Sequence, residues 1–112
     1  MDLILFRIEI FSKQPYVLKD FYEQVMELPV THTSADGNSF ELGSARVQIM
    51  ISKSLQEVRN KIRVCFQTME FKSYKQLLVQ KGAVVSATKV KEGRFFFELK
   101  DPDGNEVAIY QV

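Results

Sequence analysis

The sequence has few of the features that mark exported, membrane-spanning or disulfide-bonded proteins. It holds a single cysteine, Cys65, which rules out an internal disulfide and a multi-cysteine zinc cluster and is typical of a reducing compartment. No stretch approaches the roughly 18 apolar residues of a membrane span, and Arg7 and Glu9 interrupt the apolar start before a signal sequence could form. We therefore expect a cytoplasmic protein without a membrane segment.

Charge of one sign is also scarce. The chain has 15 lysines and arginines against 14 aspartates and glutamates, a net charge of +1, and no run of five like charges. Duplex nucleic acid requires a basic stripe, so nucleic acid is not an expected partner. The 112 residues, 46% of them hydrophobic, are enough for one folded domain over 1–112.

Hydrophobic periodicity predicts an α+β fold. Residues 3–11 alternate between two faces as a strand does, and apolar residues at helical spacing predict a helix from Pro15 to about Leu28. Asp36-Gly37 is typical of a hairpin turn between two short strands. The predicted order is strand, helix and three more strands, the last three at 30–34, 40–42 and 46–52.

The same order recurs after a polar linker at 53–60. A strand at 62–67 is followed by a helix that begins near Phe71 and has Gly82 at its C-terminal end. Three further strands are predicted at 83–90, 94–99 and 106–111.

Matching positions in the two halves indicate a duplication. Arg7 and Arg63 are 56 positions apart, and Val47-Gln48-Ile49 aligns with Val107-Ala108-Ile109 at a separation of 60. We infer two tandem βαβββ units, about 1–53 and 61–112. Their curved sheets are expected to surround a cleft, with the helices on the outer face.

Two motifs resemble the vicinal oxygen chelate superfamily, which includes glyoxalase I, bleomycin-resistance proteins and extradiol dioxygenases. Residues 20–30, read as Asp-Phe-Tyr-Glu-Gln-Val-Met-Glu-Leu-Pro-Val, are similar to its first-helix motif, with Glu27 where glycine is usual. Asp101-Pro102-Asp103-Gly104 and the strand to Ile109 resemble its final turn and strand. The resemblance spans nearly the whole chain and implies a homodimer, with the cleft formed within one chain or across two.

The resemblance also implies where a metal ion would bind. In metal-dependent members the ligands come from the first and last strands of each unit, and those positions here hold Arg7, Gln48, Arg63 and Ala108. A guanidinium has no lone pair to donate, and alanine has no donor atom. We therefore expect no metal ion and no other cofactor.

The candidate binding residues lie on the predicted cleft face. Arg7 and Arg63 offer planar, bidentate donors that suit a carboxylate or phosphate, with pairing to acidic neighbours as the alternative. Phe11 and other apolar side chains could wall a pocket for a flat organic ligand. The predicted ligand-binding residues are Arg7, Gln48, Met50, Arg63, Cys65, Phe95, Ala108 and Tyr110.

Three titratable side chains have alternative roles. Glu9 is the candidate catalytic base, with an ion pair to Arg7 or Arg63 as the structural alternative. His32 could join Glu9 or Glu41 in an unusual metal site, or could be solvated. Cys65 would be a nucleophile only if nearby arginines stabilised its thiolate, and we expect a buried, unreactive thiol.

The first functional hypothesis is a metal-free protein that binds a small anionic or aromatic organic molecule, favoured by the missing metal ligands. The alternative is an enzyme: a lyase or isomerase with Glu9 as base, or a dioxygenase-type enzyme with an unusual metal site that draws on His32, Glu9, Glu41 or Gln48. A third hypothesis is a regulatory protein whose cleft has closed. The segment Lys53 to Asn60 could be a lid or a solvated connector.

Overall fold

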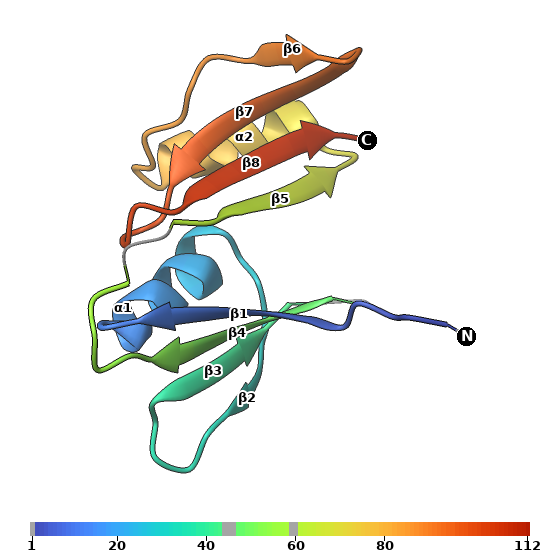
Figure 1. Ribbon diagram of the computed structural model, residues 1–112. Helices are drawn as coiled ribbons and strands as arrows, with labels where there is room; N and C mark the ends of the chain where they lie inside the picture. The colour runs from blue at the N-terminus through green and yellow to red at the C-terminus, as the bar shows by residue number, and fades with distance from the viewer. Residues whose placement is uncertain (1, 44–46, 59–60) are drawn as a thin grey trace. The chain divides into compact units, whose positions relative to one another are not determined.

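The computed structural model describes residues 2–43, 47–58 and 61–112, and it confirms the α+β fold with two tandem units (Figure 1). The chain divides into two compact units, Met1–Arg59 and Asn60–Val112. No helix in the described part of the chain is long and apolar enough to cross a membrane.

Unit 1 is a four-stranded mixed sheet with one helical segment. Its elements are β1 (Arg7–Ser12), α1 (Pro15–Asp20), η1 (Phe21–Val25), β2 (Val30–Thr33), β3 (Ser39–Leu42) and β4 (Gln48–Lys53). The strand order is β1-β4-β3-β2, with β1 parallel to β4 and the other pairs antiparallel. The predicted single helix is α-helical in α1 and continues as the π-helix η1, where the Met26 N–H donates to the Phe21 carbonyl at 3.1 Å.

The predicted strand from residue 3 begins only at Arg7, and the residues before it are largely exposed: Leu3 by 97% and Phe6 by 62%. A strand needs a ladder partner, and β4 begins at Gln48, which is the residue opposite Arg7. Arg46, the first residue of the predicted fourth strand, lies outside the described residues.

Unit 2 repeats the arrangement. Its elements are β5 (Arg63–Thr68), α2 (Phe71–Gln80), β6 (Lys89–Lys91), β7 (Arg94–Lys100) and β8 (Glu106–Gln111). The strand order is β5-β8-β7-β6, with β5 parallel to β8. Of the predicted strand at 83–90, only Lys89 and Val90 fall within β6. At Ser86 the backbone N–H donates to the Glu98 carbonyl, and the hydroxyl, not a backbone carbonyl, accepts from the Glu98 N–H.

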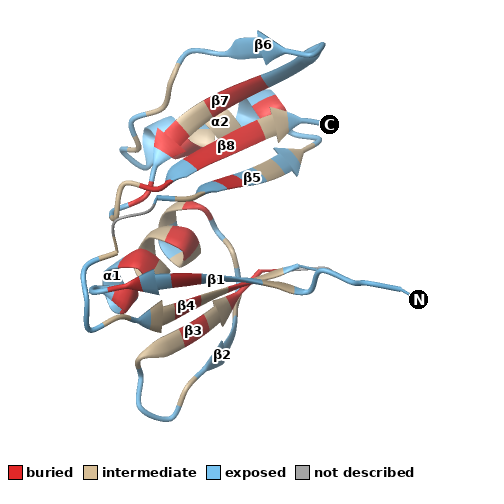
Figure 2. Cartoon of the chain, in the orientation of Figure 1, coloured by how far each residue is buried: buried red, intermediate tan, exposed pale blue. Residues whose placement is uncertain are grey.

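In each unit the core lies between the helix and one sheet face (Figure 2). In unit 1 alternate residues of β3 and β4 are buried beneath the helix, whose Tyr22 and Leu18 are completely buried. In unit 2 Phe71 of α2 packs on Phe97 of β7, with ring centroids 5.4 Å apart. Each sheet therefore presents its second face away from its own helix.

Both helical segments end at a residue with left-handed backbone. Gly82 follows α2 with φ of +87°, and the N–H groups of Gly82 and Ala83 donate to carbonyls in the last turn. Glu27 follows η1 with φ of +63°. Glycine adopts this conformation without steric cost, which explains why glycine is the usual residue at the Glu27 position in the resembled motif.

The turn between β7 and β8 is organised by the buried carboxylate of Asp101. It accepts hydrogen bonds from the backbone N–H groups of Asp103 and Asn105 and from the Asn105 side chain, all at 2.9 Å. The Asn105 Oδ1 atom accepts in turn from the Ile62 N–H at 3.1 Å. The motif thus ties the β7–β8 turn to the chain just before β5.

The strand register corrects the alignment of the two units. Opposite Arg7 lies Gln48, whereas opposite Arg63 lies Glu106, and Ala108 lies opposite Cys65. Glu106 is therefore the counterpart of Gln48, at a separation of 58, and the predicted pairing of Gln48 with Ala108 at 60 is wrong by two residues. A slip of two leaves every side chain on the same sheet face, so the hydrophobic pattern does not detect it.

Candidate functional site

The sheet face of unit 2 opposite α2, called here the open face, brings together most of the candidate residues of that unit. Adjacent strands place their outward side chains in cross-strand rows. From β5 outward these rows are Arg63, Glu106 and Lys100; Cys65, Ala108 and Glu98; and Gln67, Tyr110, Phe96 and Lys89.

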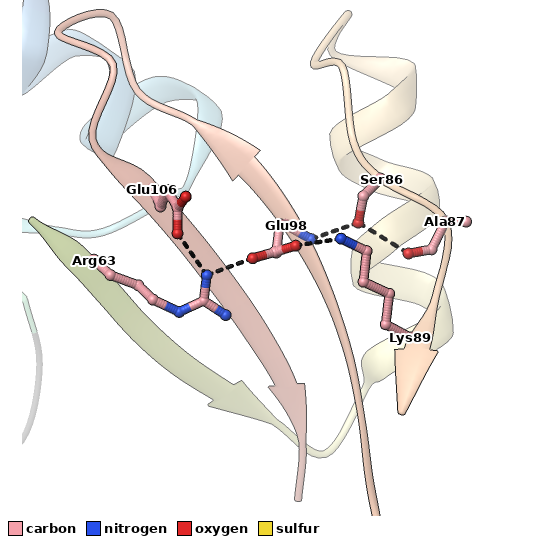
Figure 3. Close-up of polar contacts among 6 residues, drawn as sticks. All are labelled: Arg63, Ser86, Ala87, Lys89, Glu98 and Glu106. Atoms are coloured by element: carbon pink, nitrogen blue, oxygen red, sulfur yellow. Dashed lines mark hydrogen bonds and ion pairs between the residues drawn. The ribbon is translucent and has the colours of Figure 1, made fainter. Parts of the chain in front are cut away.

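A charge cluster, called here the Arg63 cluster, forms the polar part of the open face (Figure 3). The Arg63 Nη1 atom donates to Glu106 Oε2 at 2.7 Å and also to Glu98 Oε2. The other Glu98 oxygen accepts from Lys89 Nζ at 2.6 Å. Two cations and two carboxylates, each on a different strand of the sheet, thus compensate one another.

Hydrogen bonding fixes the charge states in this cluster. Bonds to Glu98, Tyr110 and Glu106, in that order of size, raise the pKa of Arg63 above its already high value. The bond from Arg63, followed by the bond from Lys89, lowers the pKa of Glu98 below its ordinary value. Arg63 is therefore a permanent cation whose charge its neighbours already balance.

Beside the charge cluster, two stacked rings lie between two arginines. Phe96 and Tyr110 are parallel within 22°, with centroids 5.0 Å apart. The Arg63 guanidinium lies 5.9 Å from the Phe96 ring, and the Arg94 guanidinium lies 5.1 Å from the Tyr110 ring. Phe96 is 7% exposed and Tyr110 is half-buried, so the stack presents mainly the edge of the Tyr110 ring and the two guanidinium groups, which are surfaces that bind aromatic molecules.

Cys65 differs from the expectation of a buried thiol, because it is exposed. The outward residues of β5 all lie on the open face, and the small Ala108 beside Cys65 does not cover it. Ala108 itself is completely buried between Cys65 and Glu98 in its row.

The sequence hypothesis placed Phe95 and Tyr110 on the same face of the sheet, but the structure places them on opposite faces. In β7 it is Phe96 that lies opposite Tyr110, whereas Phe95 points to the helix side and lines a groove with α2. Three adjacent phenylalanines left the inward and outward positions undetermined by sequence.

In unit 1 the candidate residues also lie on the face away from the helix. The Arg7 Nη2 atom is 3.0 Å from Glu9 Oε1, which confirms the ion pair expected as the alternative to a catalytic role for Glu9. Gln48 lies opposite Arg7 and Met50 opposite Glu9, and Phe11 is half-exposed on the same face.

His32 lies beside Glu41 in a row that continues through Met50 to Glu9. Glu9 is two strands from Glu41, about 10 Å at the usual strand spacing. The Glu41 carboxylate accepts from Thr31 Oγ1 at 3.0 Å. This row does not bring three donor side chains to one point.

The resemblance places metal ligands on the first and last strands of each unit, and few donor side chains lie at those positions. Among residues 2–43, 47–58 and 61–112, no three His, Cys, Asp or Glu side chains are grouped so that they could hold a metal ion. With the corrected register, the positions at issue in the last strands are Met50 and Ala108 or Gln48 and Glu106, and the first strands supply arginines. A guanidinium beside such a site repels a cation.

Sequence reasoning missed Phe96, Glu98, Glu106 and Lys89. The available signal was the triplet Phe-Glu-Leu, which recurs at 40–42 and 97–99 and puts a glutamate between two buried residues of a strand. A charged residue so placed faces outward, but its partner is decided by strand pairing.

Comparisons with known proteins agree with this fold. A family model described as a glyoxalase-like domain matches residues 7–110. Among curated proteins, none matches the chain in sequence. Lactoylglutathione lyase from Agrobacterium tumefaciens is 13% identical with a TM-score of 0.82, over 99% of this chain and 95% of that one. TnmS3, an antibiotic-binding protein from Streptomyces sp. CB03234, is 16% identical with a TM-score of 0.85, over 98% and 96%. At these identities the structural likeness establishes the fold alone.

Proposed function

The chain belongs to the glyoxalase-like domain family of the vicinal oxygen chelate superfamily, and on that premise we propose that it binds a flat aromatic organic molecule without a metal ion. The observation that carries the proposal is the stack of Arg63, Phe96, Tyr110 and Arg94 on the open face. We further propose that the two units work as one domain, that copies of the chain pair as a homodimer, and that the protein acts in the cytoplasm.

Metal independence is supported by the chemistry of Arg63. Its guanidinium cannot donate a lone pair, and its bonds to Glu98 and Glu106 occupy the carboxylates nearest to it. A divalent ion would have to displace this cation and compete for the same oxygens.

Of the two ligand classes considered from sequence, the aromatic one has the better support. An anion would gain from Arg63 only if the guanidinium were free of carboxylates, yet Glu98 and Glu106 already balance its charge. Stacking requires no unpaired charge, and aromatic pairs are worth about 0.5–1.5 kcal/mol beyond the area they bury. The antibiotic-binding neighbour TnmS3 shares the fold and is consistent with a binding role.

The test uses two probes that differ by one carboxylate, coumarin and coumarin-3-carboxylate, titrated into 15N-labelled protein. We expect coumarin to shift the backbone resonances of β5, β7 and β8. Tyr110→Leu should weaken coumarin binding by about threefold to tenfold, the range that one aromatic contact supplies. Tyr16→Leu in unit 1 is the matched control and should leave the affinity unchanged.

Three outcomes would contradict the proposal. Coumarin leaving the open-face resonances unshifted would refute the site. Binding of the carboxylate probe alone would replace the aromatic class with an anionic one. Zinc added to the protein should not shift the resonances of Cys65, Glu98 or Glu106, and a saturable shift there would refute metal independence. Native mass spectrometry of untagged protein measures the dimer, any bound metal ion and any co-purified molecule in one spectrum.

A further inference from the structure

A groove on the helix side of unit 2 has no role in the proposed function. It has a volume of about 790 Å³ and lies between α2, Thr88 and the start of β7. Pockets that bind drug-sized molecules range from about 300 to 1,000 Å³, so the groove has room for one such ligand. It is on the opposite side of the sheet from the Arg63 cluster.

The walls of the groove are apolar and incompletely covered. Phe71 and Phe95 line it together with Val79 of α2. Phe95 is 48% exposed and Val79 is 54% exposed, although both line the groove. A ligand that covered these side chains would remove apolar surface from water, which favours binding.

The charged groups at the groove all have the same sign. Lys72 and Lys75 line it one helical turn apart, and the remaining lining residues are Thr88 and three glutamines, with no aspartate or glutamate among the nine. In the described part of the chain neither lysine has an ion-pair partner. The groove therefore favours a ligand that carries negative charge.

Lys75 is held in place at the groove. Its Nζ atom donates to Thr88 Oγ1 at 2.9 Å and lies 5.4 Å from the centroid of the Phe97 ring. A side chain already fixed by two contacts loses less conformational entropy on binding than a free lysine would. Two of the three ammonium protons remain available for an acceptor.

We propose that this groove is a second binding site, for an amphipathic organic anion whose flat apolar body covers Phe95 and Val79 and whose single carboxylate or sulfonate is bound by Lys72 and Lys75. The site goes beyond the proposed function, because it uses none of the open-face residues. Its ligand differs from the open-face ligand in requiring the negative charge.

The test uses the full chain and a matched pair of fluorescent probes: 8-anilinonaphthalene-1-sulfonate and N-phenyl-1-naphthylamine, which has the same rings without the sulfonate. We expect the sulfonate to bind more tightly and to shift the resonances of α2, Thr88 and Phe95. Lys75→Gln and Lys72→Gln should each weaken sulfonate binding by about threefold to fivefold, as for half-exposed ion pairs, without changing the affinity of the neutral probe. Lys91→Gln, which removes a lysine away from the groove, is the control.

Raised ionic strength should weaken binding of the sulfonate probe and not of the neutral probe, because salt screens the charge of the sulfonate and not its rings. Val79→Asp should abolish sulfonate binding while leaving coumarin binding at the open face intact, so failure of one site is distinguishable from failure of the other. The proposal is overturned if the two lysine variants bind the sulfonate as tightly as the unmodified protein. It is also overturned if the sulfonate shifts the open-face resonances instead.

Discussion

Replacing Arg63 by methionine tests whether the Arg63 cluster is a charge-compensating unit. Glu98 and Glu106 both accept from the same Nη1 atom, so the two accepting oxygens are separated by at most two hydrogen-bond lengths, about 5.5 Å. At that separation and an effective dielectric constant between 20 and 80, two negative charges repel by roughly 1–3 kcal/mol. The side chains are 24% and 52% exposed and Lys89 still binds Glu98, so water and Lys89 reduce the repulsion.

We therefore expect Arg63→Met to lower the free energy of unfolding at pH 7 by about 1–2 kcal/mol, or the melting temperature by about 4–8 °C. Arg94→Met is the matched control. Arg94 is on the same sheet face but donates to Gln67 and to a backbone carbonyl, not to carboxylates. Its loss removes an arginine without leaving two acids facing each other. Adding Glu106→Gln to Arg63→Met should restore most of the lost stability.

The pH dependence of the free energy of unfolding gives the sharper measurement, because its slope has opposite signs in the unmodified protein and in Arg63→Met. In the unmodified protein the lowered pKa of Glu98 contributes stability that is present above the unfolded value of 4.5 and is lost as the pH falls through the folded value. In Arg63→Met the facing carboxylates raise each other's pKa, so the variant should gain stability as the pH falls from 7 toward 5. Urea unfolding at several pH values measures both curves. A variant with the same curve as the unmodified protein would refute the reasoning.

Three further predictions concern stability. Glu27→Gly should stabilise the fold by about 0.5–1 kcal/mol in thermal unfolding, because φ of +63° is strained for glutamate, and Gly82→Ala at φ of +87° should destabilise it by about 1 kcal/mol. If both changes shift the melting temperature in the same direction, the backbone argument is wrong. Asp101→Ala should cost about 2–4 kcal/mol, since it leaves buried donors unpaired, whereas a neutral result in urea unfolding would contradict the turn's role. Glu9→Gln should change stability by less than about 1 kcal/mol, because the pair with Arg7 is exposed, and should leave coumarin binding unchanged; a turnover assay that lost activity in this variant would instead favour the enzyme hypothesis.

Local patterns in the sequence predicted much of the fold. The alternation in β5, with Val64 buried and Cys65 exposed, follows from a period of two that a single strand carries by itself. Gly82 predicted the end of α2 because a left-handed residue is needed at that one position. The turn at Asp101 was recognisable because its hydrogen bonds join residues at most four positions apart.

The alignment of the units and the partners of Arg63 required the tertiary structure. The lengths of the loops decide whether Gln48 or Met50 is the counterpart of Ala108 in the alignment of the two units. Either alignment preserves the hydrophobic pattern. Glu98 and Glu106 are 35 and 43 residues from Arg63, so nothing local to β5 indicates that they bind it.

The sequence by itself determined the order of the elements and the two faces of most strands. Only the tertiary structure decided which charges meet on the open face, that Phe95 lines a groove with α2, and that Cys65 is exposed. The physical reason is the range of the interactions: periodicity and turn geometry act over a few residues, whereas pairing between strands depends on register and on the lengths of the loops that connect them.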